Sequence, residues 1–330
     1  MKDGFLRAVC PIDTELESSV NRQAGKLLCR NLLYSSNVLA GMSAKRPPEI
    51  EQVANLAMQL SQPYLADYGA SRSRHDFTQR QLMSCLVLRA YLRTTYRGVL
   101  AALAGNPSLR ACLGMTEKLP HFTTLQKFST RSEIGSIAQR MIARIGQAAL
   151  QGNEAKEPAA MDSTGLDINS PSAYFETRRG KRYRHYIKLS AIVLCGSLFP
   201  LALVVDHGPS NDRVQVPELL RQAQAVGQPA QLLADAGYDA EWIHVRCRED
   251  WGVESLIVPN GQRADGQRNG RWRAQMSAEH MRERGYGRRW AIETFFSALK
   301  RTTGSALSTR TTVTQLTEAA VRVLAYVLRR

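Results

Sequence analysis

The chain has 330 residues, 44% of them hydrophobic, which suits a folded protein with room for two domains and argues against a disordered one. Its formal net charge of +15 favours polyanionic partners such as nucleic acid, although a protein that is merely basic is the alternative. The six cysteines stand singly, without zinc-ligand spacing, which argues against a disulfide scaffold and a zinc site.

Two stretches bear on where the protein works. The start, Met1-Lys2-Asp3, lacks the basic, apolar and small-residue pattern of a signal peptide. Residues 189–205 hold no charge, but they are fewer than the roughly 20 that span a membrane, and Gly196 and Pro200 interrupt them. We therefore expect a soluble cytoplasmic protein, associated with the nucleoid, that has no membrane partner.

The N-terminal half of the chain is expected to be helical. Apolar residues recur at helical spacing in three stretches, 82–92, 99–103 and 134–150. We expect residues 1–70 to be mostly helical, with no assigned role, and residues 71–150 to form a helical DNA-binding region.

Within this region, residues 96–131 contain the pattern of a possible helix-turn-helix. A short helix over residues 96–103 ends at Gly105-Asn106-Pro107, and a turn leads to residues 120–128. That last segment begins with small and polar residues and continues with basic ones, including Lys127. A helix-turn-helix would place it in the major groove, with Lys127 as a DNA contact. A plain helical bundle with a solvated basic face is the alternative.

The C-terminal half changes to short strands separated by helices. The expected strands are residues 159–166, 185–195, 198–206, 231–234 and 255–258, and the expected helices are residues 213–225, 240–247 and 287–303. Gly196-Ser197 suits a hairpin turn between the second and third strands. Three strands followed by alternating helices and strands predict an α/β fold, a mixed five-stranded sheet with helices on both faces, preceded by an all-α region. This order resembles ribonuclease-H-like folds, and we assign residues 155–330 to such a domain.

Two aspartates belong to strands of the predicted sheet. Asp162 lies inside the first strand, where a buried acid is costly unless a partner such as a divalent cation satisfies it. Asp235 directly follows the fourth strand, at the end where open α/β sheets bind ligands. Each aspartate alone could be an ordinary cap or turn residue. The pair in neighbouring strands favours a functional site.

The predicted helix near the C-terminus presents a third acid, Glu293, among cations. At about 100° per residue, Tyr286, Arg289 and Lys300 share its face if the helix extends back to Tyr286. Such a face suits a metal ligand beside a phosphate backbone. The alternative is a surface glutamate paired with Arg289 four residues earlier.

The motifs around these residues resemble those of the DDE transposases of bacterial insertion sequences. The resemblance is to the group that carries the signature Tyr-(2)-Arg-(3)-Glu-(6)-Lys. Tyr286, Arg289, Glu293 and Lys300 match that signature at every spacing. The segments around the two aspartates, Met161-Asp162-Ser163-Thr164-Gly165 and Ala234-Asp235-Ala236-Gly237-Tyr238-Asp239, resemble the two aspartate motifs of the family. The resemblance covers residues 160–330. Glu293 follows Asp235 too closely for the large β-rich insertion domain of some members, so a hairpin intermediate is not implied.

The resemblance implies a reaction and its partners. Asp162, Asp235 and Glu293 would be the catalytic residues and would hold two Mg²⁺ ions, or Mn²⁺, for in-line phosphodiester displacement. Cleavage at the element ends would precede transfer of the freed 3′-hydroxyl into target DNA. Tyr286, Arg289 and Lys300 would bind the DNA end. The expected partners are the terminal inverted repeats and target DNA, with a homodimer in the DNA complex.

Two other functions stay open at this point. A structure-selective nuclease of the same fold would cut DNA without joining it. A non-catalytic DNA-binding descendant of a transposase would lack at least one of the three acids.

Further basic residues suit the same task. Residues 178–188 mix cations with aromatics, a composition that favours backbone contacts and stacking, although a solvated basic loop is the alternative. We expect DNA contacts from Arg182, His185 and Lys188. The remaining acids near the motifs are expected to have supporting, capping or turn roles: Asp167, Asp206, Asp212 and Asp239.

Overall fold

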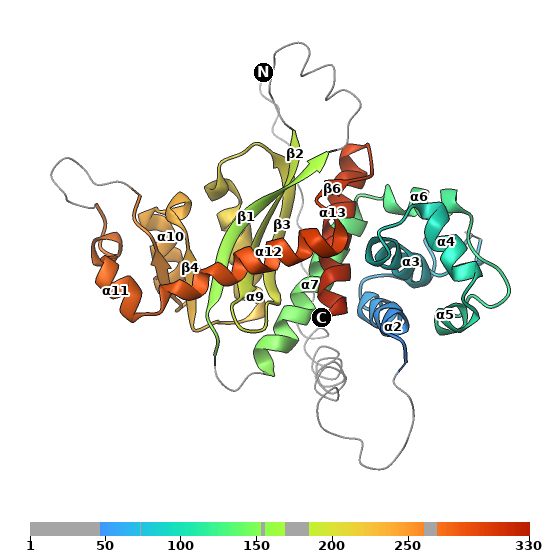
Figure 1. The fold of residues 1–330 in the computed structure, drawn as a ribbon, viewed down its shortest axis with the longest axis horizontal. Coiled ribbons are helices and arrows are strands. Elements are labelled where there is room, and N and C mark those ends of the chain that lie inside the picture. The colour runs from blue at the N-terminus through green and yellow to red at the C-terminus, as the bar shows by residue number, and fades with distance from the viewer. Residues whose placement is uncertain (1–46, 73, 153–155, 169–184, 261–268) are drawn as a thin grey trace, which may run out of the picture. The chain divides into compact units, whose positions relative to one another are not determined.

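The computed structural model describes residues 47–72, 74–152, 156–168, 185–260 and 269–330, which all belong to one compact unit, Lys45–Arg330 (Figure 1). The expectation of helices in residues 1–46 therefore lies outside the described residues. Across these ranges, no helix is both long enough and apolar enough to cross a membrane.

Six helices make up the described N-terminal part. They are α2 (Glu49–Ser61), α3 (Gln79–Tyr91), α4 (Tyr96–Ala104), α5 (Pro107–Cys112), α6 (Phe122–Ser129) and α7 (Glu133–Gln151), among the residues described before β1. Side-chain caps define several starts. Thr78 and Gln81 form a reciprocal capping box at α3, and the Asn106 side chain accepts from Leu109 N at α5. The helices expected over 82–92, 99–103 and 134–150 are α3, α4 and α7, and the segment 120–128 contains α6.

A mixed sheet forms the centre of the C-terminal part. Its strands are β1 (Ala159–Ile168), β2 (Tyr186–Leu194), β3 (Pro200–Gly208), β4 (Gln231–Ala234), β5 (Glu254–Ile257) and β6 (Ala306–Leu307). The order is β3-β2-β1-β4-β5, with β6 also paired to β1. The first three strands are antiparallel, whereas β4, β5 and β6 join in parallel. The predicted α/β fold class is confirmed. The sheet has a sixth strand, β6, which was not predicted because its two residues are too few to form a recognisable pattern.

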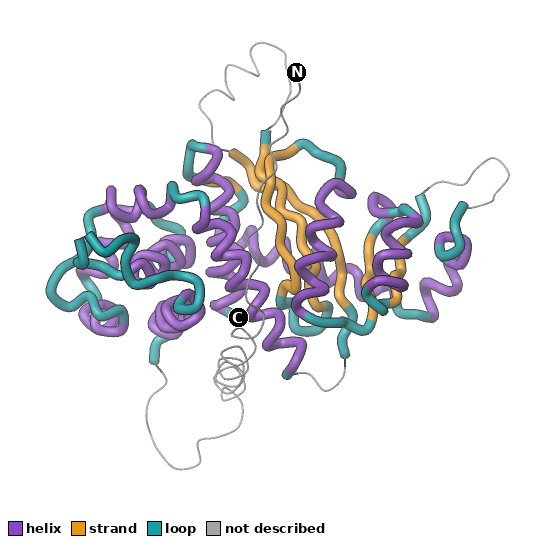
Figure 2. Tube along the Cα trace, turned by 180° about the vertical axis from the view of Figure 1, so that it is seen from behind, coloured by secondary structure: helices purple, strands orange, loops and turns teal. Residues whose placement is uncertain are grey.

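Helices cover both faces of this sheet (Figure 2). One face packs on α9 (Val216–Val226), where Met161 and Ile192 share a buried cluster with Leu219. Side chains alternate between the faces of a strand, so Asp162 points to the opposite face. There α12 (Trp290–Thr303) crosses in front of β1 in Figure 1. The sheet thus presents Asp162 toward the helix that carries Glu293.

The turn between β2 and β3 differs slightly from the expected hairpin. Leu198 has a φ of 58°, and β3 begins only at Pro200. The buried Glu157 carboxylate accepts hydrogen bonds from the backbone of Gly196 and from Ser197, the latter at 2.9 Å from N and 2.7 Å from Oγ. A Cβ at position 196 would lie 2.6 Å from Glu157 Oε2, so a larger residue there would displace this carboxylate. The turn is therefore held by a carboxylate outside the hairpin.

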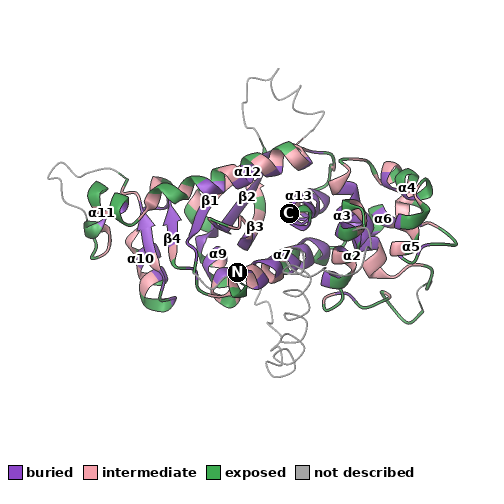
Figure 3. Cartoon of the chain, turned by 60° about the horizontal axis from the view of Figure 1, so that its bottom comes forward, coloured by how far each residue is buried: buried purple, intermediate pink, exposed green. Residues whose placement is uncertain are grey.

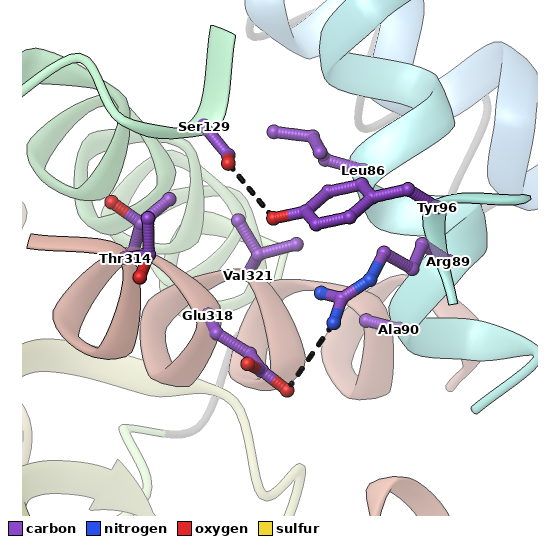
Figure 4. A pocket seen from close by; sticks show the side chains of 9 residues that line it. Leu86, Arg89, Ala90, Tyr96, Ser129, Thr314, Glu318 and Val321 are labelled. Carbon is purple, nitrogen blue, oxygen red and sulfur yellow. Dashed lines mark hydrogen bonds and ion pairs between the residues drawn. The ribbon is translucent and has the colours of Figure 1, made fainter. Parts of the chain in front are cut away.

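The C-terminal helix α13 (Thr312–Arg329) contacts the sheet and also α2, α3 and α7. It is almost wholly buried, as Figure 3 shows. Glu318 on α13 lies 2.6 Å from Arg322 Nη2 and 3.8 Å from Arg89 of α3. Figure 4 shows the Arg89–Glu318 ion pair beside the Tyr96–Ser129 hydrogen bond of 2.8 Å. One helix therefore joins the helical region to the sheet.

The other elements after the sheet's third strand are short. They are the 3-10 helices η1 (Asp212–Gln215), η2 (Ala236–Tyr238), η4 (Arg273–Gln275) and η5 (Tyr286–Arg289), the helices α10 (Glu241–Val245) and α11 (Ala278–Glu283), and the π-helical turn η3 (Arg246–Asp250). Two of them, η2 and η5, hold residues of the candidate site.

Candidate active site

The two predicted aspartates lie at equivalent positions on neighbouring parallel strands. Met161 of β1 pairs with Ala234, the last residue of β4. Asp162 follows Met161 within β1, and Asp235 follows Ala234 just beyond the end of β4. Parallel strands lie about 4.8 Å apart, and in-register residues project to the same face. The sheet therefore brings both carboxylates to one edge.

The Asp235 side chain caps the turn that follows β4. Its Oδ1 accepts a hydrogen bond from Gly237 N at 2.9 Å at the start of η2. A Cβ on Gly237 would lie 3.1 Å from Asp235 Oδ1 and 3.7 Å from Asp212 Oδ2, so both carboxylates face the same point of the turn. The capping role and a place in the acidic site are thus compatible.

The charge state of Asp162 reflects its surroundings. Burial raises the pKa of Asp162 to about 6, against the hydrogen bond from Ser163 N, which lowers it. The nearby Asp235 raises the pKa further, Arg289 lowers it, and Asp212 raises it slightly. Asp162 therefore lies within electrostatic range of both Asp235 and Arg289. Crowded carboxylates of this kind favour a cation.

Glu293 reaches this edge from α12. The expected single helix from Gly287 onward is wrong at its start, because Tyr286–Arg289 form the 3-10 helix η5 and α12 begins at Trp290. Arg289 Nη2 still pairs with Glu293 Oε1, and Arg289 Nη1 lies 3.6 Å from Asp162 Oδ2. One guanidinium therefore spans the acids of β1 and α12.

Tyr286 and Lys300 complete the four-residue signature. The Tyr286 hydroxyl donates to Ala234 O at 3.0 Å, which ties η5 to the end of β4 next to Asp235. Burial raises the pKa of Tyr286 to about 12, so the phenol stays neutral. Lys300 lies about two turns beyond Glu293 on the same helix, half-exposed, and makes no ion pair with the three acids in the described structure. Its ammonium is therefore available to a ligand.

The other predicted DNA contacts are dispersed. Lys127 is exposed on α6, and His185 is exposed just before β2, whereas Arg182 lies outside the described residues. The Lys188 side chain is only 3% exposed, with Nζ 2.7 Å from Asp212 Oδ1 and 2.7 Å from Ser210 O. This burial does not fit a DNA contact, and we assign Lys188 instead to holding Asp212.

Supporting contacts that sequence reasoning missed lie beneath the aspartates. Ser163 Oγ lies 2.8 Å from the Tyr238 hydroxyl and 2.7 Å from Ser190 Oγ, and Ser190 Oγ donates to Gln215 Oε1 at 2.9 Å. Tyr238 is fully buried, and burial raises its pKa. The only indication in the sequence is its place in the second-aspartate motif. This network fixes the strand segment on which Asp162 lies.

The spare acids have the expected supporting roles where they make contacts. Asp239 accepts from Arg273 Nε at 2.6 Å and from Asn260 N at 2.7 Å, and Asp206 Oδ1 accepts from His207 N at 2.7 Å. Asp212 pairs with Lys188. Asp167 is an exposed residue of β1.

The three acids have the donor chemistry of a hard divalent cation, since all are carboxylate oxygens. As the side chains stand, no three potential ligands in the described part of the chain converge closely enough to hold a metal ion. In this arrangement the Arg289 guanidinium pairs with both Asp162 and Glu293. The three side chains therefore fit a divalent cation in their donor chemistry but not in their present positions.

Comparison with protein families identifies the family of the chain. The family model described as "Transposase DDE domain" matches residues 154–328, more than half of the chain, and this range includes all three acids. The chain therefore belongs to the DDE transposase family. No curated protein matches the chain.

Proposed function

We propose that this transposase cleaves DNA at the ends of an insertion sequence and joins the freed 3′-hydroxyls to target DNA. One observation carries the proposal. Asp162 and Asp235 directly follow Met161 and Ala234, which pair between the parallel strands β1 and β4, and Arg289 links Asp162 to Glu293 on α12. This arrangement supports a site built from three acids of separate elements, with cations that suit phosphate binding beside them.

In this proposal Asp162, Asp235 and Glu293 hold Mg²⁺ or Mn²⁺. When bound, the ions would activate water or a DNA hydroxyl and stabilise the leaving oxygen. The chain's own residues bind and orient the DNA. Arg289 and Lys300 would contact phosphates at the cut, and the neutral Tyr286, fixed by its bond to Ala234 O, would help position the DNA end. The Ser163 and Tyr238 network keeps the Asp162 carboxylate in place.

The helical region provides candidate contacts to the rest of the DNA. We propose that residues 71–150 read the inverted repeat, with α6 and Lys127 at the DNA, and that residues 155–330 form the catalytic domain. His185 and Arg182 would contact the backbone. Two copies of the chain would assemble as a dimer on the paired ends. The net charge of +15 supports affinity for DNA, although it does not choose between these surfaces.

The test uses the full chain and a supercoiled plasmid that carries the gene with its flanking genomic DNA. Asp162→Asn, Asp235→Asn and Glu293→Gln should each reduce Mg²⁺-dependent cleavage by about 10³-fold or more, since residues that act as a unit fail together. Glu283→Gln is the matched control, because it removes an exposed carboxylate of α11. Wild-type cleavage by any of the three variants would overturn the assignment.

Joining distinguishes the transposase from a nuclease of the same fold. Strand-transfer products with a second plasmid are expected wherever cleavage is seen. Cleavage of branched DNA without any joined product would favour the structure-selective nuclease instead.

A further inference from the structure

Arg289 spans two of the acids that the proposed function assigns to metal binding. Its Nη1 lies 3.6 Å from Asp162 Oδ2, and its Nη2 pairs with Glu293 Oε1. The Arg289 and Asp162 side chains are each 21% exposed, so this contact is largely shielded from water. A shielded ion pair is screened less than one at the surface. The guanidinium thus competes with a cation for the Asp162 carboxylate, and less strongly for that of Glu293, whose side chain is 58% exposed.

The same guanidinium is one of the groups that we propose to bind a DNA phosphate. An arginine fork binds carboxylate or phosphate oxygens with the same N–H groups. The N–H groups that contact Asp162 and Glu293 cannot at the same time form full-strength hydrogen bonds to a phosphate. Arg289 therefore has two alternative sets of partners, the protein's acids or the DNA backbone.

The neighbouring arginine makes different contacts. Arg288 Nη2 donates to Gln231 Oε1 at 3.1 Å, and its Nε donates to Gly285 O at 3.4 Å. Arg288 is exposed and makes no recorded ion pair with the three acids in the described structure. Two adjacent residues of equal charge thus differ in whether they contact the acids.

We propose that Arg289 couples DNA binding to divalent-metal binding. In the free protein it occupies Asp162 and Glu293 and weakens their affinity for a cation. When Arg289 moves to a DNA phosphate, both carboxylates become available. The inference rests on the proposed function, and it adds that the site binds metal more tightly when DNA is present.

Thermodynamic linkage gives this coupling a definite sign. If DNA tightens metal binding through Arg289, metal must tighten DNA binding by the same factor. Removing the guanidinium should therefore tighten metal binding to the free protein and abolish the effect of DNA. A residue that merely supported the site would act in the opposite direction, because its loss would weaken metal binding.

The experiment measures Mn²⁺ binding to the full chain by electron paramagnetic resonance, with and without a short pre-cleaved duplex of the element end. The duplex alone is the blank, because DNA also binds Mn²⁺. Wild-type protein should bind Mn²⁺ about fivefold more tightly, or better, when the duplex is present. Free Arg289→Ala should already bind about as tightly as the wild-type complex, with little further effect of DNA.

Arg288→Ala is the matched control and should behave like the wild type. Arg289→Gln serves as a second variant in case the alanine variant folds poorly, and circular dichroism checks both. Unchanged or weaker Mn²⁺ binding by the free, folded Arg289 variants would overturn the coupling. Asp162→Asn separates the two levels of inference. If this variant binds Mn²⁺ like the wild type, the metal site itself, and with it the proposed function, is wrong.

Discussion

At the scale of single residues, Asp162 links stability to pH. In the metal-free protein the pKa of Asp162 is about 6, raised chiefly by burial from its ordinary value of 3.8. The folded state therefore binds this proton more tightly than the unfolded state does. Its contribution to stability is present below about pH 4 and is lost as the pH rises through 6. A buried acid placed for function thus weakens the free protein near neutral pH.

Asp162→Asn should remove this pH dependence. With chelator present, we expect the variant at pH 8 to be more stable than the wild type by roughly 1–2 kcal/mol, a value reduced to allow for the partial exposure of Asp162. At pH 4 the two proteins should be about equally stable. Urea unfolding at pH 4, 5, 6 and 8 measures the difference. Asp250→Asn, an exposed acid, is the control and should shift stability by less than about 0.5 kcal/mol at every pH. A pH-independent effect of Asp162→Asn would contradict the reasoning.

Lys188 shows where single-residue prediction stops. Its cationic side chain beside aromatic residues suggests a DNA contact, yet its position in β2 places the ammonium within the protein against Asp212. The pattern of residues along the chain can predict a strand, but it does not predict a polar partner that comes from a turn distant in sequence. Asp212 comes from η1, after β3, and nothing local to Lys188 indicates it.

Asp212→Asn should leave Lys188 as a buried cation without its charged partner. We expect a loss of roughly 1–3 kcal/mol in unfolding free energy, because the variant leaves the buried Lys188 ammonium uncompensated, although Asp212 itself is 45% exposed. The double variant Lys188→Met/Asp212→Asn should recover much of that loss. Chemical denaturation of both variants provides the double-mutant comparison, and equal losses in the two would argue against the pairing.

At the scale of elements, the position of α7 depends on a glycine. A Cβ on Gly146 would lie 2.1 Å from Pro200 O, so the helix touches the start of β3 without a side chain between them. Gly146→Ala should force the helix outward and cost about 2 kcal/mol or more. Gly105→Ala is the control, because its Cβ would find no atom closer than 3.7 Å. Thermal unfolding of the pair tests the close contact, and similar melting temperatures would refute it.

Prediction of elements was best where periodicity and turn chemistry agreed. Strand β4 was predicted at its observed bounds, and the spacing around Glu293 correctly indicated a helix that faces the sheet. The 3-10 helix η5 carries the hydrogen bond from Tyr286 to Ala234 O, a tertiary contact that spacing does not reveal. Residues 304–330 carried no predicted element. Buried polar residues of α13, namely Gln315, Glu318 and Arg322, obscure which of its faces is internal.

At the scale of the whole molecule, α13 packs against both the helical region and the sheet and so connects them. Glu318 pairs with Arg89 of the helical region, and its carboxylate also accepts from Thr309 N at 2.9 Å, in the segment that leads from α12 to α13. Arg322, its second ion-pair partner, donates to Gly304 O at 3.1 Å, at the end of α12. The helix that carries Glu293 and the helices proposed to read DNA are therefore anchored to the same buried carboxylate.

This arrangement predicts cooperative unfolding of residues 45–330. All four tryptophans lie in the C-terminal part, at positions 242, 251, 272 and 290, so their fluorescence reports the sheet domain, whereas far-ultraviolet circular dichroism also reports α2–α7.

Glu318→Ala should lower the unfolding free energy by about 3–5 kcal/mol, because it leaves two buried arginines uncompensated. The two probes should still give coincident transitions. Glu133→Gln, on the exposed start of α7, is the control. If the dichroism transition preceded the fluorescence transition in the wild type, the two regions would be independent domains. The spacing between bound DNA and the active site would then not be set by α13.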